Sequence, residues 1–299
     1  MTSAGRFAPS PSGELHVGNL RTAILAWLFA RSSGRTFLLR VEDLDRARSG
    51  AEAEQLRDLA AIGVTWDGDV VRQTARGALY TAAISRLQAA GLTYECFCTR
   101  REIQEAPSAP HAPQGAYPGT CRNLDPAELE FKRSTRPAAV RLRAGVAEYR
   151  VHDVLHGAYA GVVDDFVLRR NDGVYAYNLA VVVDDAEQGI DQVVRGDDLL
   201  PSTPRQAYLA SLLNIPVPEY AHVPLVVNSD GVRLAKRDGA VTLRDLALAD
   251  IPSDAVRDRL LASLGLPAGR LEHALDAFDP TALPREPWVW TGMGSPGST

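Results

Sequence analysis

The chain has 299 residues, a formal net charge of −5 and 45% hydrophobic residues, which suffices for a sizeable core in one large domain or two. No run of residues approaches the ~20 apolar positions that a membrane span needs, and the first residues lack the apolar region of a secretory signal. We therefore expect a cytoplasmic protein without a membrane partner. The net charge does not mark a nucleic-acid binder, although local charge matters more than the sum.

A broken loop separates a short apolar start from a helix-like segment near the amino terminus. Residues 6–21 read RFAPSPSGELHVGNLR, and the apolar segment continues to Ala30. The first N–H groups of a helix lack partners within it and its dipole favours negative charge, so the segment predicts a phosphate site. Gly18 lets a flat ligand approach the backbone, and His16 can donate to a phosphate oxygen. A polar loop that only caps a core helix is the alternative.

Strands and helices alternate along the sequence that follows. Strands are predicted at residues 36–41 and 223–227, and helices at residues 20–33, 75–91 and 203–213. This alternation predicts an α/β fold with a doubly wound parallel sheet. Ligands of such sheets bind at the carboxyl ends of the strands, where Glu42 lies.

The three cysteines, Cys96, Cys98 and Cys121, lie within one short stretch. Their odd number argues against a disulfide framework in a cytoplasmic chain. Cys-x-Cys followed by a third cysteine suggests a structural zinc site that needs a fourth ligand, and the usual ligand preferences of zinc nominate His111. Reduced and buried cysteines without metal are the alternative.

A basic turn and a helical region occupy the last part of the chain. Residues 228–231 read NSDG, which predicts a turn, and the basic segment RLAKR follows at residues 233–237. One or two amphipathic helices are predicted within residues 250–275. Residues 276–299 are rich in proline and glycine, so we expect loose order at their end.

Several of these segments resemble the signatures of the class I aminoacyl-tRNA synthetases, in the form that glutamyl enzymes have. Residues 16–19, HVGN, keep two of the four letters of the HIGH signature, and residues 6–13, RFAPSPSG, match its more specific glutamyl flank. Residues 233–237 look like the KMSKS loop, with Lys236 as its second lysine. Matching blocks also lie at residues 40–45, 175–185 and 195–206, so the resemblance covers residues 5 to about 250.

The resemblance implies that the chain activates L-glutamate with ATP and Mg²⁺. Arg6 and Arg195 would bind the two carboxylates, with the side-chain carboxylate favoured for Arg6, and Glu42 would bind the ammonium group. The implied glutamate-binding residues are Arg6, Phe7, Ala8, Pro9, Ser10, Glu42, Tyr177 and Arg195. The implied catalytic residues are His16 and Lys236, and the implied ATP-binding residues are His16, Gly18, Asn19 and Lys236.

The resemblance also bears on the acceptor of the glutamyl group and on the metal. Full glutamyl-tRNA synthetases carry an anticodon-binding domain for which we see no room here, and in this the chain resembles the glutamyl-Q tRNA(Asp) synthetase family. That family transfers glutamate to the queuosine base in the anticodon of tRNA(Asp), and its Cys-x-Cys…Tyr-x-x-x-Cys pattern makes Tyr117 the expected fourth zinc ligand instead of His111. A truncated glutamyl-tRNA synthetase that charges a tRNA acceptor end, or a non-catalytic tRNA- or nucleotide-binding paralogue, are the alternatives.

The motifs divide the chain into four predicted parts. Residues 1–94 form a Rossmann-like catalytic half with the HIGH-like segment, and residues 95–180 form an inserted subdomain with the zinc site. Residues 181–245 form the second catalytic half with the KMSKS-like loop, and residues 246–299 form a short helical region with a flexible tail. We expect the protein to be a monomer.

Overall fold

A seven-stranded sheet forms the centre of the fold, and the computed structural model describes residues 3–105, 117–234 and 241–293. The strands lie in the order β3-β2-β1-β9-β10-β6-β7. Their bounds are β1 Ala4–Phe7, β2 Thr36–Val41, β3 Val71–Arg72, β6 Glu148–Asp153, β7 Gly157–Val162, β9 Ile190–Gly196 and β10 Glu219–Val223. Neighbouring strands are parallel except β6 and β7, which form an antiparallel hairpin.

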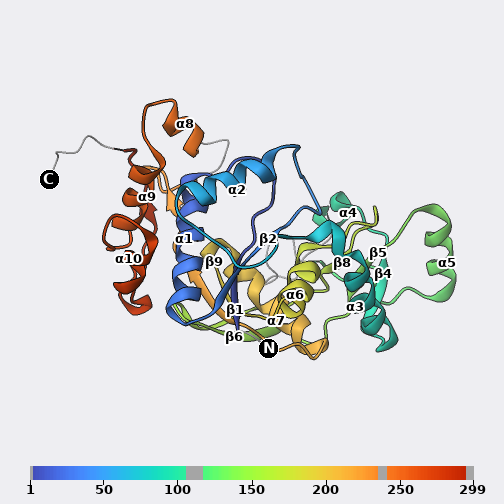
Figure 1. Ribbon diagram of the computed structural model, residues 1–299. Coiled ribbons are helices and arrows are strands. Elements are labelled where there is room, and N and C mark those ends of the chain that lie inside the picture. Colours follow the sequence, from blue (N-terminus) through green and yellow to red (C-terminus); the bar gives the residue numbers. More distant parts are fainter. Residues whose placement is uncertain (1–2, 106–116, 235–240, 294–299) are drawn as a thin grey trace.

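Helices pack on both faces of this sheet (Figure 1). On one face, α1 (Val17–Ser32) contacts β1 and β9, and α9 (Ser253–Ala262) and α10 (Leu271–Asp276) lie against α1. On the other face lie α6 (Tyr177–Glu187) and α7 (Thr203–Leu212), with α3 (Gly77–Ala89) against α6. The remaining α-helices of the described ranges are α2 Ala51–Ala61, α4 Arg100–Glu105, α5 Pro126–Thr135 and α8 Leu243–Ala247. The predicted doubly wound α/β fold is confirmed.

The strand order reverses at β1, and this reversal positions the ligand site. The chain runs from β1 to β2 and β3 on one side of the sheet, whereas β9 and β10 lie on the other side of β1. Open α/β sheets bind ligands in the crevice at the carboxyl ends of the strands that flank such a reversal. The ends of β1 and β9, which carry Arg6 and Arg195, are therefore the place to look for a site.

A second, smaller sheet lies beside the main one and contains the cysteine region. It is antiparallel and consists of β4 (Thr93–Cys96), β5 (Ala139–Leu142) and β8 (Val167–Arg169). The predicted four-part division of the chain stays a prediction. Within the predicted insert of residues 95–180, however, β6 and β7 extend the main sheet instead of the small one.

The structure differs from the predicted elements near the carboxyl end. The single strand predicted at residues 223–227 is two strands. The first, β10, ends at Val223 because Pro224 has no backbone N–H to donate to the sheet. The second piece, β11 (Val226–Val227), pairs with β12 (Trp288–Val289). This pairing makes part of residues 276–299 an ordered strand, while the loose order predicted for the end of the chain stays a prediction. No helix in the described ranges has the length and apolar character to cross a membrane.

Candidate active site

A cleft of about 920 Å³ opens at the reversal of the strand order. Its volume lies in the range of small-molecule and cofactor sites. Eleven of the residues implied for glutamate and ATP line this one cleft: Arg6, Phe7, Ala8, Pro9, Ser10, His16, Gly18, Asn19, Glu42, Tyr177 and Arg195. Lys236 and His111 lie outside the described residues. The structure thus brings residues from four separate segments together, while their individual roles stay predictions.

The loop after β1 is fixed by hydrogen bonds from two neighbouring segments. The N–H of Glu42 donates to the carbonyl of Pro9 at 2.9 Å. The side-chain amide of Gln55 on α2 donates to the carbonyls of Ser10 at 3.0 Å and Gly13 at 2.6 Å. Gln55 is buried, so it provides two backbone acceptors with a partner away from water. The sequence analysis did not single out Gln55, although a glutamine on the buried side of a helix could have indicated a residue that holds a neighbouring loop.

His16 caps helix α1 at the helix N-terminus that the sequence predicts as a phosphate site, and this phosphate site stays a prediction. Its Nδ1 accepts hydrogen bonds from the N–H groups of Gly18 at 3.1 Å and Asn19 at 3.3 Å. The Asn19 side chain in turn accepts from the N–H of His16 at 3.2 Å. Both helical N–H groups therefore have a partner, and an accepting Nδ1 puts the proton of neutral His16 on Nε2. A Cβ at Gly18 would lie 3.0 Å from the His16 ring, so a larger residue at this position would require the ring to shift by a few tenths of an ångström.

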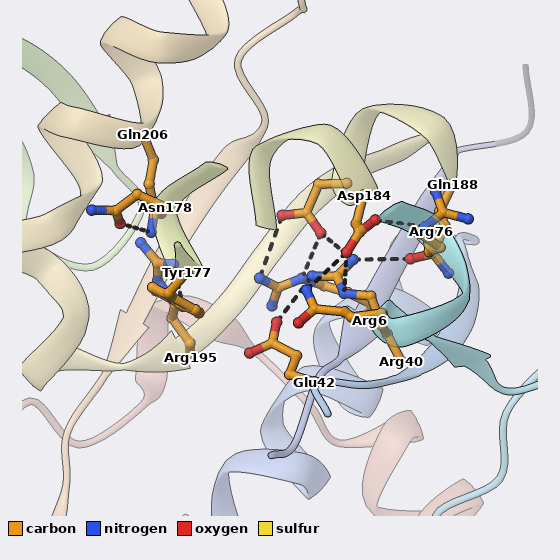
Figure 2. Close-up of polar contacts among 12 residues, drawn as sticks. Arg6, Arg40, Glu42, Arg76, Tyr177, Asn178, Asp184, Gln188, Arg195 and Gln206 are labelled. Atoms are coloured by element: carbon orange, nitrogen blue, oxygen red, sulfur yellow. Dashed lines mark hydrogen bonds and ion pairs between the residues drawn. The ribbon is translucent and has the colours of Figure 1, made fainter. Parts of the chain in front are cut away.

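Arg6, Arg40 and Glu42 form one buried cluster of charges (Figure 2). Asp185, which is also buried, belongs to it. Asp185 accepts from Arg6 Nε at 3.2 Å and from Arg40 Nη1 at 2.7 Å. Burial opposes the charge on Asp185, but the two guanidinium groups lower its pKa below the usual range. Glu42 accepts from Arg40 Nη2 at 3.3 Å, and burial raises the pKa of Glu42 above its usual value despite Arg40 and Arg6.

Asp184 connects this cluster to the helices that pack around it. The carboxylate is fully buried and accepts hydrogen bonds from Tyr80 at 2.9 Å and Gln73 at 2.8 Å. It also pairs with Arg76, and Arg40 Nε lies 3.7 Å from it. The cluster therefore contains three guanidinium groups and three carboxylates, so its charges balance when Glu42 is ionised.

Arg195 lies apart from that cluster, beside Tyr177 (Figure 2). Its Nε donates to His222 Nε2 at 3.0 Å, its Nη2 to Thr203 Oγ1 at 2.8 Å and its Nη1 to the Tyr177 hydroxyl at 3.4 Å. Arg195 is buried, and among the described residues no carboxylate forms an ion pair with it. The cleft thus contains a buried positive charge whose protein partners are neutral, and an anionic ligand would balance it. His222 and Thr203 were not found from the sequence.

Residues 233 and 234 of the KMSKS-like segment line the same cleft. Arg233 lines it and forms an ion pair with Asp198, which follows β9. The ion pair joins this segment to the strand that carries Arg195. Leu199 also lines the cleft.

The three cysteines gather beside the small sheet and could hold a metal ion. Their sulfur atoms lie within 4.8 Å of one another, and those of Cys98 and Cys121 are 3.5 Å apart. Tetrahedral zinc with Zn–S bonds of about 2.3 Å places sulfurs about 3.8 Å apart, so the donor set fits. The Tyr117 hydroxyl lies 3.3 Å from Cys96 Sγ and 3.6 Å from Cys98 Sγ, where a fourth ligand would be.

The fold and the cleft are those of a class I aminoacyl-tRNA synthetase catalytic domain. Residues 4–277 match the family described as tRNA synthetases class I (E and Q), catalytic domain, and the chain belongs to this family. It is 66% identical to the glutamyl-Q tRNA(Asp) synthetase of Nocardia farcinica, over 97% of this chain and 94% of that protein. It is 52% identical to the protein of the same name from Cutibacterium acnes, over 91% of this chain and 79% of that protein.

A solved structure supports the same assignment. The glutamate-tRNA synthetase of Elizabethkingia anophelis superimposes with a TM-score of 0.81 at 26% identity, over 97% of this chain and 68% of that chain. The predicted resemblance to the glutamyl-Q tRNA(Asp) synthetases and the predicted enzyme class, a ligase of the class I synthetase type, are confirmed.

Proposed function

We propose that this enzyme activates L-glutamate with ATP to glutamyl-adenylate and transfers the glutamyl group to the queuosine base in the anticodon of tRNA(Asp). The observation that supports glutamate as the substrate is the buried Arg195. Its protein partners are neutral, and it shares the cleft with Arg6 and Glu42. The choice of acceptor is supported by the name of the relatives, which are 45% to 66% identical to the chain. Because that acceptor is a cytoplasmic RNA, the proposal includes a cytoplasmic location, and we propose a monomer as the acting form.

Charge balance suggests how glutamate lies in the cleft. The side-chain carboxylate keeps its charge throughout the reaction, so it suits Arg195, a buried cation to which the described residues supply no carboxylate partner. The α-carboxylate loses its charge when it becomes the mixed anhydride, and Arg6, already paired with Asp185, can donate to it without binding it too strongly. Glu42 binds the ammonium group, and Tyr177 and Ser10 add hydroxyl groups. This assignment replaces the sequence-based preference for Arg6 as the partner of the side-chain carboxylate.

Activation is an in-line displacement. An oxygen of the glutamate α-carboxylate forms a bond to the α-phosphorus of ATP while the bond from that phosphorus to pyrophosphate breaks. Little proton transfer is needed, so positioning and charge stabilisation supply the rate. We propose that His16, Gly18, Asn19 and Lys236 bind the triphosphate, and that Mg²⁺ neutralises part of its charge. A hydroxyl oxygen of the queuosine ring then forms an ester bond to the glutamyl carbonyl carbon, the bond from that carbon to the phosphate oxygen of AMP breaks, and the hydroxyl proton passes to solvent.

Charging with purified tRNA tests the acceptor. We expect labelled glutamate and ATP to yield stable glutamylation of total tRNA that contains queuosine, and none of the same tRNA from cells unable to make queuosine. Incorporation that is equal in both samples would contradict the proposal and indicate charging of an acceptor end. If the protein catalysed no glutamate-dependent exchange of pyrophosphate into ATP, the non-catalytic alternative would replace it.

We also propose that Cys96, Cys98, Tyr117 and Cys121 bind one structural zinc ion. Such a site would fix the connection between β4 and the segment that ends at Cys121, and structural zinc sites contribute directly to folding.

The zinc site makes a prediction for metal content. Purified protein is expected to contain about one zinc ion per chain, and Cys121→Ala is expected to lose it and to melt at a lower temperature. Thr120→Ala, at an exposed neighbouring position, is the control and should keep both. Elemental analysis and thermal unfolding make the measurement. Metal-free wild-type protein would refute the site.

A further inference from the structure

Arg195 lies at one end of a buried chain of hydrogen bonds that continues away from the cleft. Its Nε donates to Nε2 of His222 on the neighbouring strand β10. Nδ1 of the same imidazole lies 2.6 Å from the carboxylate of Asp153, at the end of β6. The side chains of His222 and Asp153 are both fully buried. Neither residue lines the cleft, so neither is placed to touch a substrate.

The partners on both sides fix the tautomer of His222. A guanidinium group only donates, so Nε2 must be the accepting nitrogen. An ionised carboxylate only accepts, so Nδ1 must carry the proton. The Thr203 hydroxyl, 3.1 Å from Nε2, accepts from Arg195 and can donate to the same imidazole nitrogen. Every contact around the ring is consistent with neutral His222 protonated on Nδ1.

The hairpin of β6 and β7 fixes the orientation of the Asp153 carboxylate. Oδ1 of Asp153 accepts from the N–H groups of Leu155 at 2.9 Å and His156 at 3.0 Å, in the turn that joins the two strands. Oδ2 therefore faces His222, whose own backbone N–H donates to it at 3.1 Å. Pairing of Tyr220 with Asp153 brings the hairpin to the edge of β10. The hairpin thus supplies a carboxylate with a defined orientation.

We propose that Asp153 and His222 are positioning residues that orient the Arg195 guanidinium toward the substrate carboxylate. A guanidinium has five N–H donors, and three of those of Arg195 are used by His222, Thr203 and Tyr177. Within the described ranges one N–H on each terminal nitrogen remains without a partner, and this pair suits a bidentate carboxylate. The inference rests on the proposed glutamate activation and adds the two residues that prepare Arg195 for it.

The network also predicts how acid affects glutamate binding. The charged or titratable groups that face His222 are Asp153 from β6, Arg195 from β9, His156 from the hairpin turn and Tyr220 from its own strand. Burial, the largest cause, lowers the pKa of His222 below its usual value, which agrees with the neutral imidazole that the hydrogen bonds indicate. As the pH falls through this lowered pKa, a proton on Nε2 removes the acceptor of Arg195 and adds a like charge beside it. Glutamate affinity should fall at the same time.

Three variants test the positioning role through the Michaelis constants of pyrophosphate exchange. In Asp153→Asn the N–H groups of Leu155 and His156 keep the amide oxygen on their side, so the amide nitrogen faces His222. The imidazole proton of His222 must then move from Nδ1 to Nε2, where it opposes the N–H of Arg195. Asp153→Asn and His222→Leu should raise the KM for glutamate by about 10- to 100-fold, with the KM for ATP within about twofold of wild type. His222→Gln keeps an acceptor and should retain most of the glutamate affinity without its loss at acid pH. Asp191→Asn is the control, because Asp191 lies at the opposite end of β9.

Nitrogen-15 NMR of the free protein provides a measurement that does not depend on activity. We expect wild-type His222 to be protonated on Nδ1 and the Asp153→Asn protein to be protonated on Nε2. The inference is overturned if the folded Asp153→Asn and His222→Leu proteins bind glutamate as wild type does, if they lose ATP and glutamate equally, or if the tautomer is the same in both samples. If wild-type protein binds no glutamate, the proposed function fails first, and the tautomers still test the hydrogen-bond chain.

Discussion

Replacement of Arg195 by glutamine is expected to lower kcat/KM for glutamate in pyrophosphate exchange by about 10²- to 10³-fold. Arg195 is a buried cation with three neutral protein partners. Its loss leaves a substrate carboxylate in the cleft without a countercharge, and an unpaired buried charge is costly. The KM for ATP should change little, because the implied ATP-binding residues lie on another segment.

A matched control and a competing substrate sharpen this expectation. Arg35→Gln removes a guanidinium that pairs with Asp191 at the far end of the sheet, and it should leave exchange within about twofold of wild type. Glutamine is the informative second substrate, because its neutral amide needs no countercharge. Arg195→Gln should therefore narrow the preference for glutamate over glutamine. A variant that keeps wild-type kcat/KM for glutamate would show that Arg195 binds neither carboxylate.

The sequence predicts most of the cleft because its residues lie next to strand ends. Arg6, Glu42 and Arg195 all lie at or directly after the carboxyl ends of parallel strands. In a doubly wound sheet these ends meet at one edge, so local pattern and fold class together place them near one another. The motifs and the fold therefore point to the same cleft.

The supporting residues could not be predicted in this way. Asp153 and His222 are 69 residues apart and meet only because the hairpin of β6 and β7 joins β10. A lone histidine within an apolar strand is usually a satisfied core residue, and nothing local distinguishes His222 from that case. The cap formed by His16 was missed for another reason. Histidine is not among the preferred residues at helix N-caps, so its contacts with Gly18 and Asn19 follow from three-dimensional geometry.

Replacement of Asp184 by alanine is expected to lower the free energy of unfolding by about 3–5 kcal/mol. The carboxylate is fully buried and accepts from Tyr80, Gln73 and Arg76. Its removal leaves these donors without an acceptor and leaves Arg40 and Arg76 with less countercharge. Denaturant unfolding followed by circular dichroism would measure the loss, which is a large part of the 5–15 kcal/mol typical of a folded domain.

A neighbour on the same helix separates this effect from any change in helix propensity. Glu187→Ala alters an exposed residue of α6 and should change the free energy of unfolding by less than about 0.5 kcal/mol. Because Asp184 balances charge beside Asp185 and Glu42, Asp184→Ala should also weaken glutamate binding in the fraction that remains folded. A variant as stable as Glu187→Ala would mean that Arg40 and Arg76 find sufficient countercharge in Asp185 and Glu42. The carboxylate of Asp184 would then not stabilise the fold.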